Sequence, residues 1–127
     1  MSIWEGSGNV QALDVLRALG SEPGVAGALL GELQLARGGS RLLDAAASAV
    51  ADQLAAGIPE EGQARAFVSL AARALQASLL VRFAPPAVAD AFCASRLAPR
   101  FSGGYGDLPP GVDAAAIVGR ALPEVAA

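Results

Sequence analysis

Glycine and proline divide this 127-residue sequence into short segments, and almost every segment repeats its apolar residues at helical spacing. In the first, about residues 10–19, Ala12, Leu16 and Leu19 share one helix face, while Asp14 and Arg17 share the other. No segment carries the alternation and turn pairs of a β-hairpin. The sequence therefore predicts an all-α fold.

Capping residues and helix breakers predict where the helices begin and end. The expected N-caps are side chains that accept a hydrogen bond from a first-turn amide: Ser7 or Asn9, Ser21, Ser40 and Asp113. The expected stops are Gly20, Gly38-Gly39, Gly57, Pro85-Pro86 and Pro123. We expect one domain with five to six helices: a lead-in turn over residues 1–8, a helical bundle over 9–97, an irregular loop over 98–112 and a short helix over 113–122.

The longest expected helix begins at Pro59 and runs to about Phe83. One of its faces is apolar over more than three turns, which predicts that this helix is the central and most buried element. The residues of that face are Phe67, Leu70, Ala71, Ala74, Leu75 and Leu79.

The missing residue types exclude several kinds of chemistry. Without histidine, the chain has no imidazole base for a Ser or Cys triad and no HExxH zinc helix. Without lysine, it has neither a Walker A loop nor a Schiff-base nucleophile. A single cysteine, Cys93, forms no internal disulfide or thiolate cluster, and we expect it to be a reduced, buried apolar group. We therefore expect no metal site.

We also expect no membrane span and a cytoplasmic location. The longest uncharged stretch has nine residues, Pro23 to Gly31, whereas a spanning helix needs about 20 mostly apolar residues. The N-terminus lacks the basic region and apolar core of a secretory signal.

Arginines are concentrated in the second half of the chain. The net charge is −3, yet residues 62–106 carry five arginines against Asp90 alone. Arginine binds phosphate bidentately, so a nucleic-acid contact is one interpretation. Its candidate residues are Arg17, Arg65, Arg73 and Arg96. Because Arg82 lies opposite Arg73 on a helical wheel, the arginines do not all share one face, and solvated or interface arginines are the alternative.

The most specific local signal is Trp4-Glu5-Gly6-Ser7-Gly8-Asn9, immediately before the first helix. An aromatic residue followed by a carboxylate in a glycine-containing turn is suited to hold a general base over a bound flat ring. Taken in isolation, Glu5 is better interpreted as an exposed acid near a helix start, where the helix dipole favours it only slightly.

These residues resemble the C-terminal domain of acyl-CoA dehydrogenases. The segment Ala84 to Cys93 and the Leu-Pro-Pro-Gly-Val-Asp loop at 108–113 are similar to the branch linked to the adaptive DNA-alkylation response. The resemblance covers nearly the whole chain. It implies an FAD flavoprotein in which Glu5 is the catalytic base and Trp4, Gly6 and Ser7 approach the flavin. Trp4 stands where many relatives have tyrosine, and Ser7 replaces the commoner threonine.

In that family most of the flavin pocket comes from domains that precede this region. We therefore expect a fragment that is inactive and holds no FAD alone, with the missing N-terminal flavin domains or further copies of itself as partners. The resemblance also implies a possible DNA contact, although the acidic net charge and the absence of lysine depart from a basic DNA-binding region. The alternatives are a free-standing helical interaction module and a domain that binds the DNA backbone.

Overall fold

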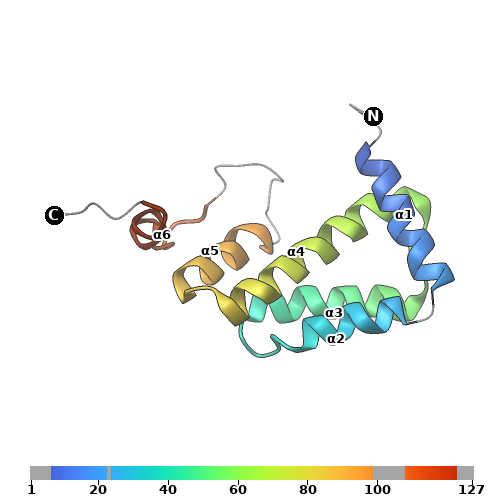
Figure 1. Cartoon of the computed structure of the whole chain (residues 1–127), viewed down its shortest axis with the longest axis horizontal. Helices are drawn as coiled ribbons and strands as arrows, with labels where there is room; N and C mark the ends of the chain where they lie inside the picture. Colours follow the sequence, from blue (N-terminus) through green and yellow to red (C-terminus); the bar gives the residue numbers. More distant parts are fainter. Residues whose placement is uncertain (1–6, 23, 99–107, 123–127) are drawn as a thin grey trace.

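The structure, a computed structural model, describes residues 7–22, 24–98 and 108–122. These ranges form six α-helices and one 3-10 turn and contain no strand, which confirms the predicted all-α class with five to six helices (Figure 1). The elements are α1 (Ser7–Ser21), α2 (Val25–Gln34), α3 (Arg41–Ala56), η1 (Glu61–Gln63), α4 (Ala64–Phe83), α5 (Pro86–Arg96) and α6 (Ala114–Ala121).

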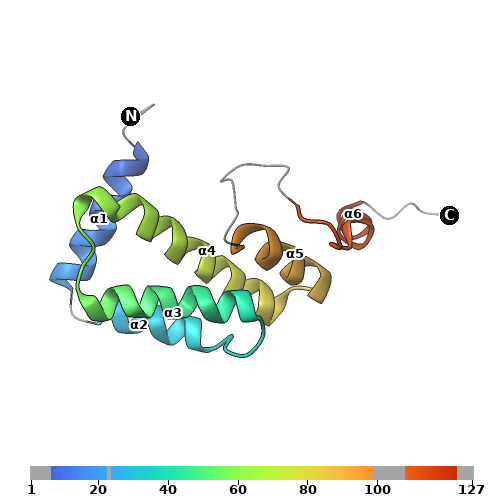
Figure 2. The same ribbon diagram turned by 180° about the vertical axis from the view of Figure 1, so that it is seen from behind.

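Helix α4 is the central element, as predicted, and packs against α1, α2, α3 and α5 (Figures 1 and 2). Its buried face advances from Phe67 through Ala71 and Ala74 to Ser78. The predicted burial of Leu79 is wrong, since this side chain is 42% exposed and Ser78 is fully buried. A small residue at position 78 lets α2 approach, and the Ser78 hydroxyl donates a hydrogen bond to the Glu32 carbonyl oxygen of α2 (3.4 Å).

The core is built from short side chains contributed by α1 to α5. Its fully buried members include Leu43 and Val50 of α3, and Leu33 of α2 is 3% exposed. Cys93 of α5 belongs to the same cluster at 3% exposure. This confirms that the cysteine packs as a small buried apolar group.

The junction between α1 and α2 differs from the prediction at both ends. Helix α1 begins at Ser7 and passes through Gly20 to Ser21, so Gly20 does not end it and Ser7 is its first helical residue. The Ser21 hydroxyl donates to the Arg17 carbonyl oxygen one turn earlier in α1 (2.7 Å), and the N-cap of α2 is Gly24, without a side-chain cap, so Ser21 does not cap α2. Gly24 precedes α2 with φ of 94°, a left-handed conformation that glycine adopts readily.

The connection between α2 and α3 is fixed by local hydrogen bonds and one close approach. Helix α2 ends at Gln34 and is followed by turns. As predicted, Ser40 caps α3, because its hydroxyl accepts a hydrogen bond from the Leu43 amide (3.3 Å). A Cβ at Gly39 would collide with Val81 of α4, so only glycine lets the chain pass this helix undisturbed.

The last three helices start at the predicted signals or close to them. A 3-10 turn, Glu61–Gln63, separates Pro59 from the start of α4 at Ala64, five residues later than expected. Pro86 occupies the first turn of α5, where its missing amide costs nothing. Asp113 caps α6 by accepting from the Ala116 amide (3.0 Å), as predicted. Helix α6 buries none of its residues and lies at the end of the molecule opposite α1 (Figures 1 and 2).

Candidate functional site

The predicted flavin motif lies at the start of α1. Trp4, Glu5 and Gly6 are outside the described residues, and Ser7 is the first residue of the helix. In the sequence, Trp4-Glu5-Gly6 therefore directly precedes the first residue of α1. The first amides of a helix have no partner within it, and they give the helix end a partial positive charge. This end of α1 is thus suited to face an electron-rich or anionic group.

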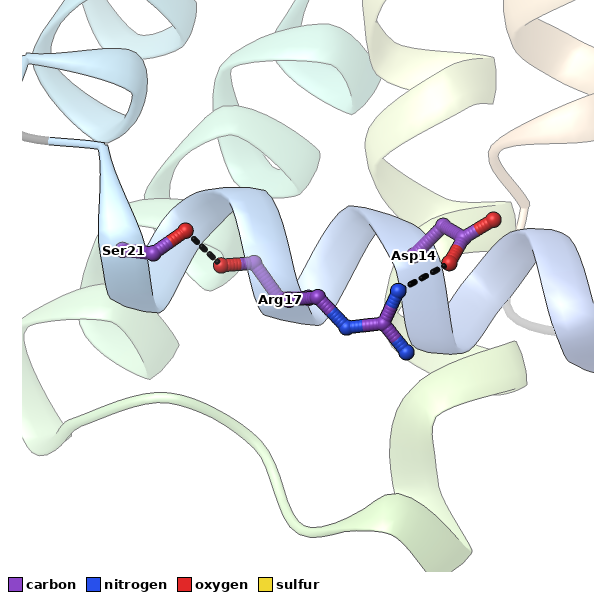
Figure 3. Close-up of polar contacts among 3 residues, drawn as sticks. All are labelled: Asp14, Arg17 and Ser21. Atoms are coloured by element: carbon purple, nitrogen blue, oxygen red, sulfur yellow. Dashed lines mark hydrogen bonds and ion pairs between the residues drawn. The ribbon is translucent and has the colours of Figure 1, made fainter.

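The outer face of α1 carries a short polar row that includes the candidate Arg17 (Figure 3). Its guanidinium forms an ion pair with Asp14 (2.8 Å), and both side chains are exposed, at 75% and 59%. An exposed pair of this spacing stabilises a helix by only about 0.2–0.5 kcal/mol. Arg17 is therefore accessible to a phosphate, but the neighbouring carboxylate offsets its charge.

Two other candidate arginines meet where α4 lies beside α5. Arg73 donates from Nη1 to the Arg96 carbonyl oxygen (2.7 Å) and from Nε to the Ser69 carbonyl oxygen (3.2 Å). Both Arg73 and Arg96 are half-buried. The Arg73 guanidinium thus satisfies a terminal carbonyl of α5 and joins the two helices.

Arg82 lies on a different side of α4 from Arg73. Its Nη1 forms an ion pair with the Glu32 carboxylate of α2 (2.9 Å), and its guanidinium carbon sits 4.6 Å from the centre of the Phe83 ring. This confirms that the arginines of α4 do not share one face. The structure brings Arg73 and Arg96 together, holds Arg17 on the outside of α1, and exposes Arg65 in the first turn of α4.

Cys93 is the one titratable group of the described residues whose pKa clearly departs from its ordinary value. Burial raises the pKa of the thiol above 9.0, the Asp90 charge adds to the rise, and a hydrogen bond with Ser40 opposes it. A thiol in this state is a poor nucleophile. Within the described ranges no three acidic or cysteine side chains gather into a metal site.

Sequence reasoning missed the exposed apolar side chains. Phe83 is 73% exposed, and Leu35 at the end of α2 is 60% exposed. Leu79 and Phe83 lie one turn apart on α4, so their spacing alone resembles a buried stripe. The signal that points the other way is the position of Phe83, at the last turn before the Pro85-Pro86 break.

The segment Glu61–Phe83 is long and apolar enough to cross a membrane, although one such helix is weak evidence for a membrane location. Only 28% of its apolar stretch is buried within the protein. Part of this helix is thus left uncovered by the rest of the chain. The expectation of a protein without a membrane span stays a prediction.

No family model, curated protein or solved structure matches this chain.

Proposed function

We propose that this chain is the C-terminal helical segment of an acyl-CoA dehydrogenase-like FAD flavoprotein of the alkylation-response type. The observation that carries the proposal is the start of α1 at Ser7, directly after Trp4-Glu5-Gly6. The resemblance implies a carboxylate followed by glycine immediately before a helix, and the Glu5-Gly6 pair directly before α1 in the sequence supports it. The all-helical fold of the described residues is consistent with it.

The residues at the start of α1 fit a flavin in chemical type. Glycine at position 6 permits close backbone approach, Trp4 offers an aromatic face, and the first amides of α1 are donors for electron-rich ring atoms. We assign Trp4, Gly6 and Ser7 to flavin contact. When bound, FAD supplies the hydride acceptor for oxidation of an acyl-CoA thioester.

In this proposal Glu5 acts as the general base, and its carboxylate takes the α-proton of the thioester. A base of this kind needs partial desolvation, which moves its pKa toward the working pH, and it must lie within hydrogen-bond reach of the proton. We assign that enclosure to the flavin domains and not to the bundle. The isolated chain is therefore expected to hold no FAD and to turn over no substrate, and we place it in the cytoplasm.

The uncovered apolar surface supports the need for a partner. Leu35, which follows the last residue of α2, and Leu79 and Phe83 of the central helix α4 each expose at least 42% of their surface. Large apolar side chains left exposed on a central helix are surface that a partner could cover. In the full flavoprotein, the flavin domains or further copies of the chain would cover them.

The test is a mixing experiment with the polypeptide encoded in frame upstream of this chain. The two are combined with FAD and separated by size exclusion while flavin absorbance is followed. The expected result is that the chain co-elutes with the upstream polypeptide and flavin, while the chain alone stays colourless. An upstream region that encodes no flavin domain would contradict the proposal. So would a flavin-loaded upstream polypeptide that elutes separately from the chain.

A second candidate function is a free-standing interaction module, and the exposed face of α2 favours it. Gly27 and Gly31 are exposed, and a Cβ at either would meet nothing within 4 Å, so a second helix could approach closely. Light scattering on the chain, alone and mixed with the flavin-loaded upstream polypeptide, distinguishes the two. A self-associated species that does not bind that polypeptide supports the module, and a mixed complex supports the flavoprotein segment.

A further inference from the structure

A groove between α2 and α3 is separate from the start of α1 and from the arginines described above. The two helices form an antiparallel hairpin, joined by the turns over residues 35–40 (Figures 1 and 2). The groove has a volume of about 300 Å³, at the lower end of the range for small-ligand sites. Four residues from each side line it at matching helical spacing: Leu30, Leu33, Gln34 and Arg37, then Asp44, Ala47, Ser48 and Ala51.

The groove is apolar at one end and charged at the other. Leu30 and Ala51 lie toward the open end of the hairpin, whereas Arg37 and Asp44 both lie next to the turn. The Gly38 amide donates to Asp44 Oδ1 (3.1 Å) and holds that carboxylate beside the turn. The two charges thus lie at one end of the groove and Leu30 and Ala51 at the other, with the polar Gln34 and Ser48 between them.

The two opposite charges of the groove are not paired with each other. The ion pairs among the described residues join Arg17 to Asp14 and Arg82 to Glu32, so the charged atoms of Arg37 and Asp44 are more than 4.0 Å apart. A simple anion bound at Arg37 would also face the carboxylate of Asp44, and a simple cation would face the guanidinium. A ligand that carries both charges close together satisfies both residues.

We propose that this groove binds a small zwitterion with an apolar side chain, the chemistry of an apolar α-amino acid. Its carboxylate would pair with Arg37, its ammonium group with Asp44, and its side chain would lie along Leu30, Leu33 and Ala47. An α-amino acid carries both charges on groups attached to one carbon atom and its apolar side chain on the same carbon, so that the charges can meet Arg37 and Asp44 while the side chain extends toward Leu30. The site is independent of the proposed flavin function.

The probe is L-leucine, titrated into the isotope-labelled chain while amide NMR shifts are followed. Three analogues each remove one element of the ligand: isocaproate lacks the ammonium group, isoamylamine lacks the carboxylate, and glycine lacks the side chain. We expect saturable shifts confined to α2, α3 and their turn, and affinity at least about tenfold weaker for each analogue.

Two variants test the assigned contacts. Arg37→Gln and Asp44→Asn should each weaken leucine binding about tenfold or more, and asparagine still offers an oxygen to the Gly38 amide. Arg41→Gln is the matched control, because Arg41 is an exposed arginine outside the lining, and it should bind like the unchanged chain. Unaltered thermal unfolding shows that each variant is folded. No saturable binding, shifts elsewhere in the chain, or equal affinity for leucine and isocaproate would overturn the proposal.

Discussion

Two phenylalanines of α4 provide a matched test of how this bundle is held together. Phe67 is 7% exposed and belongs to the core, whereas Phe83 is 73% exposed near the end of the same helix. The perturbation is truncation to alanine at either position. Because residue type and helix are the same, the two variants differ mainly in what surrounds the ring.

The expected magnitudes follow from those exposures. Removing a buried phenylalanine costs about 3–5 kcal/mol of unfolding free energy, from lost burial and the cavity that remains. Phe83 buries only about a quarter of its surface, so truncation loses under ~1 kcal/mol of burial. Its stacking with Arg82, at 4.6 Å, adds about 0.5–1 kcal/mol at an exposed site. Phe83→Ala should therefore cost under about 2 kcal/mol, which is less than the cost of Phe67→Ala.

The assay is urea unfolding followed by far-ultraviolet circular dichroism. With a slope of about 2 kcal/mol per molar urea, Phe67→Ala should lower the midpoint by roughly 1.5–2.5 M and Phe83→Ala by less than about 1 M. An equal decrease of the urea midpoint in the two variants would refute the assignment of Phe83 to the surface. It would also refute the inference that α4 has an uncovered apolar face.

The remaining predictions concern a close approach, a titration and a charge contact. Gly39→Ala should destabilise the fold by about 1–3 kcal/mol, because the new methyl group meets Val81. Gly27→Ala has open space around it and should be neutral or stabilise the fold by up to about 1 kcal/mol. A lower urea midpoint for both variants would contradict the predicted difference between the two glycines. The raised pKa of Cys93 keeps its proton in the native state where the unfolded chain has lost it, so stability should fall as pH rises above 9.0. Cys93→Ala should remove this decrease in stability. If the unfolding free energy of the variant falls with pH as steeply as that of the unchanged chain, the prediction is wrong. A salt titration on duplex DNA should show weak binding, lost as salt rises and reduced by Arg65→Gln; salt-independent affinity would exclude a backbone contact.

Local signals predicted the fold better than they predicted side-chain surroundings. The caps Ser40 and Asp113 follow from hydrogen bonds within three residues, which sequence spacing specifies directly. The exposure of Leu79 depends on how α4 is rotated against its neighbours, which periodicity fixes only to within about one residue position. Likewise, no sequence pattern shows that the Arg73 guanidinium binds a carbonyl oxygen of α5.

For the candidate sites, the sequence predicted the position of the flavin motif but not the groove between α2 and α3. Helical spacing predicted a helix from about residue 10, after the Trp4-Glu5-Gly6 motif, and α1 begins three residues earlier, at Ser7. The chemistry assigned to Glu5 came from resemblance and remains a proposal. The groove between α2 and α3 had no signal in the sequence, because its lining residues form an ordinary amphipathic pattern until the two helices are brought side by side.

The most direct test of the flavoprotein proposal is the visible spectrum of the polypeptide that joins this chain to its upstream region, recorded as an acyl-CoA is added without an electron acceptor. The account predicts that flavin absorbance bleaches in the unchanged protein and persists in Glu5→Gln, which keeps its flavin but lacks the base. Asp14→Asn, an exposed acid of α1 outside the motif, should bleach normally. Bleaching of the Glu5→Gln protein at the unchanged rate would contradict the account.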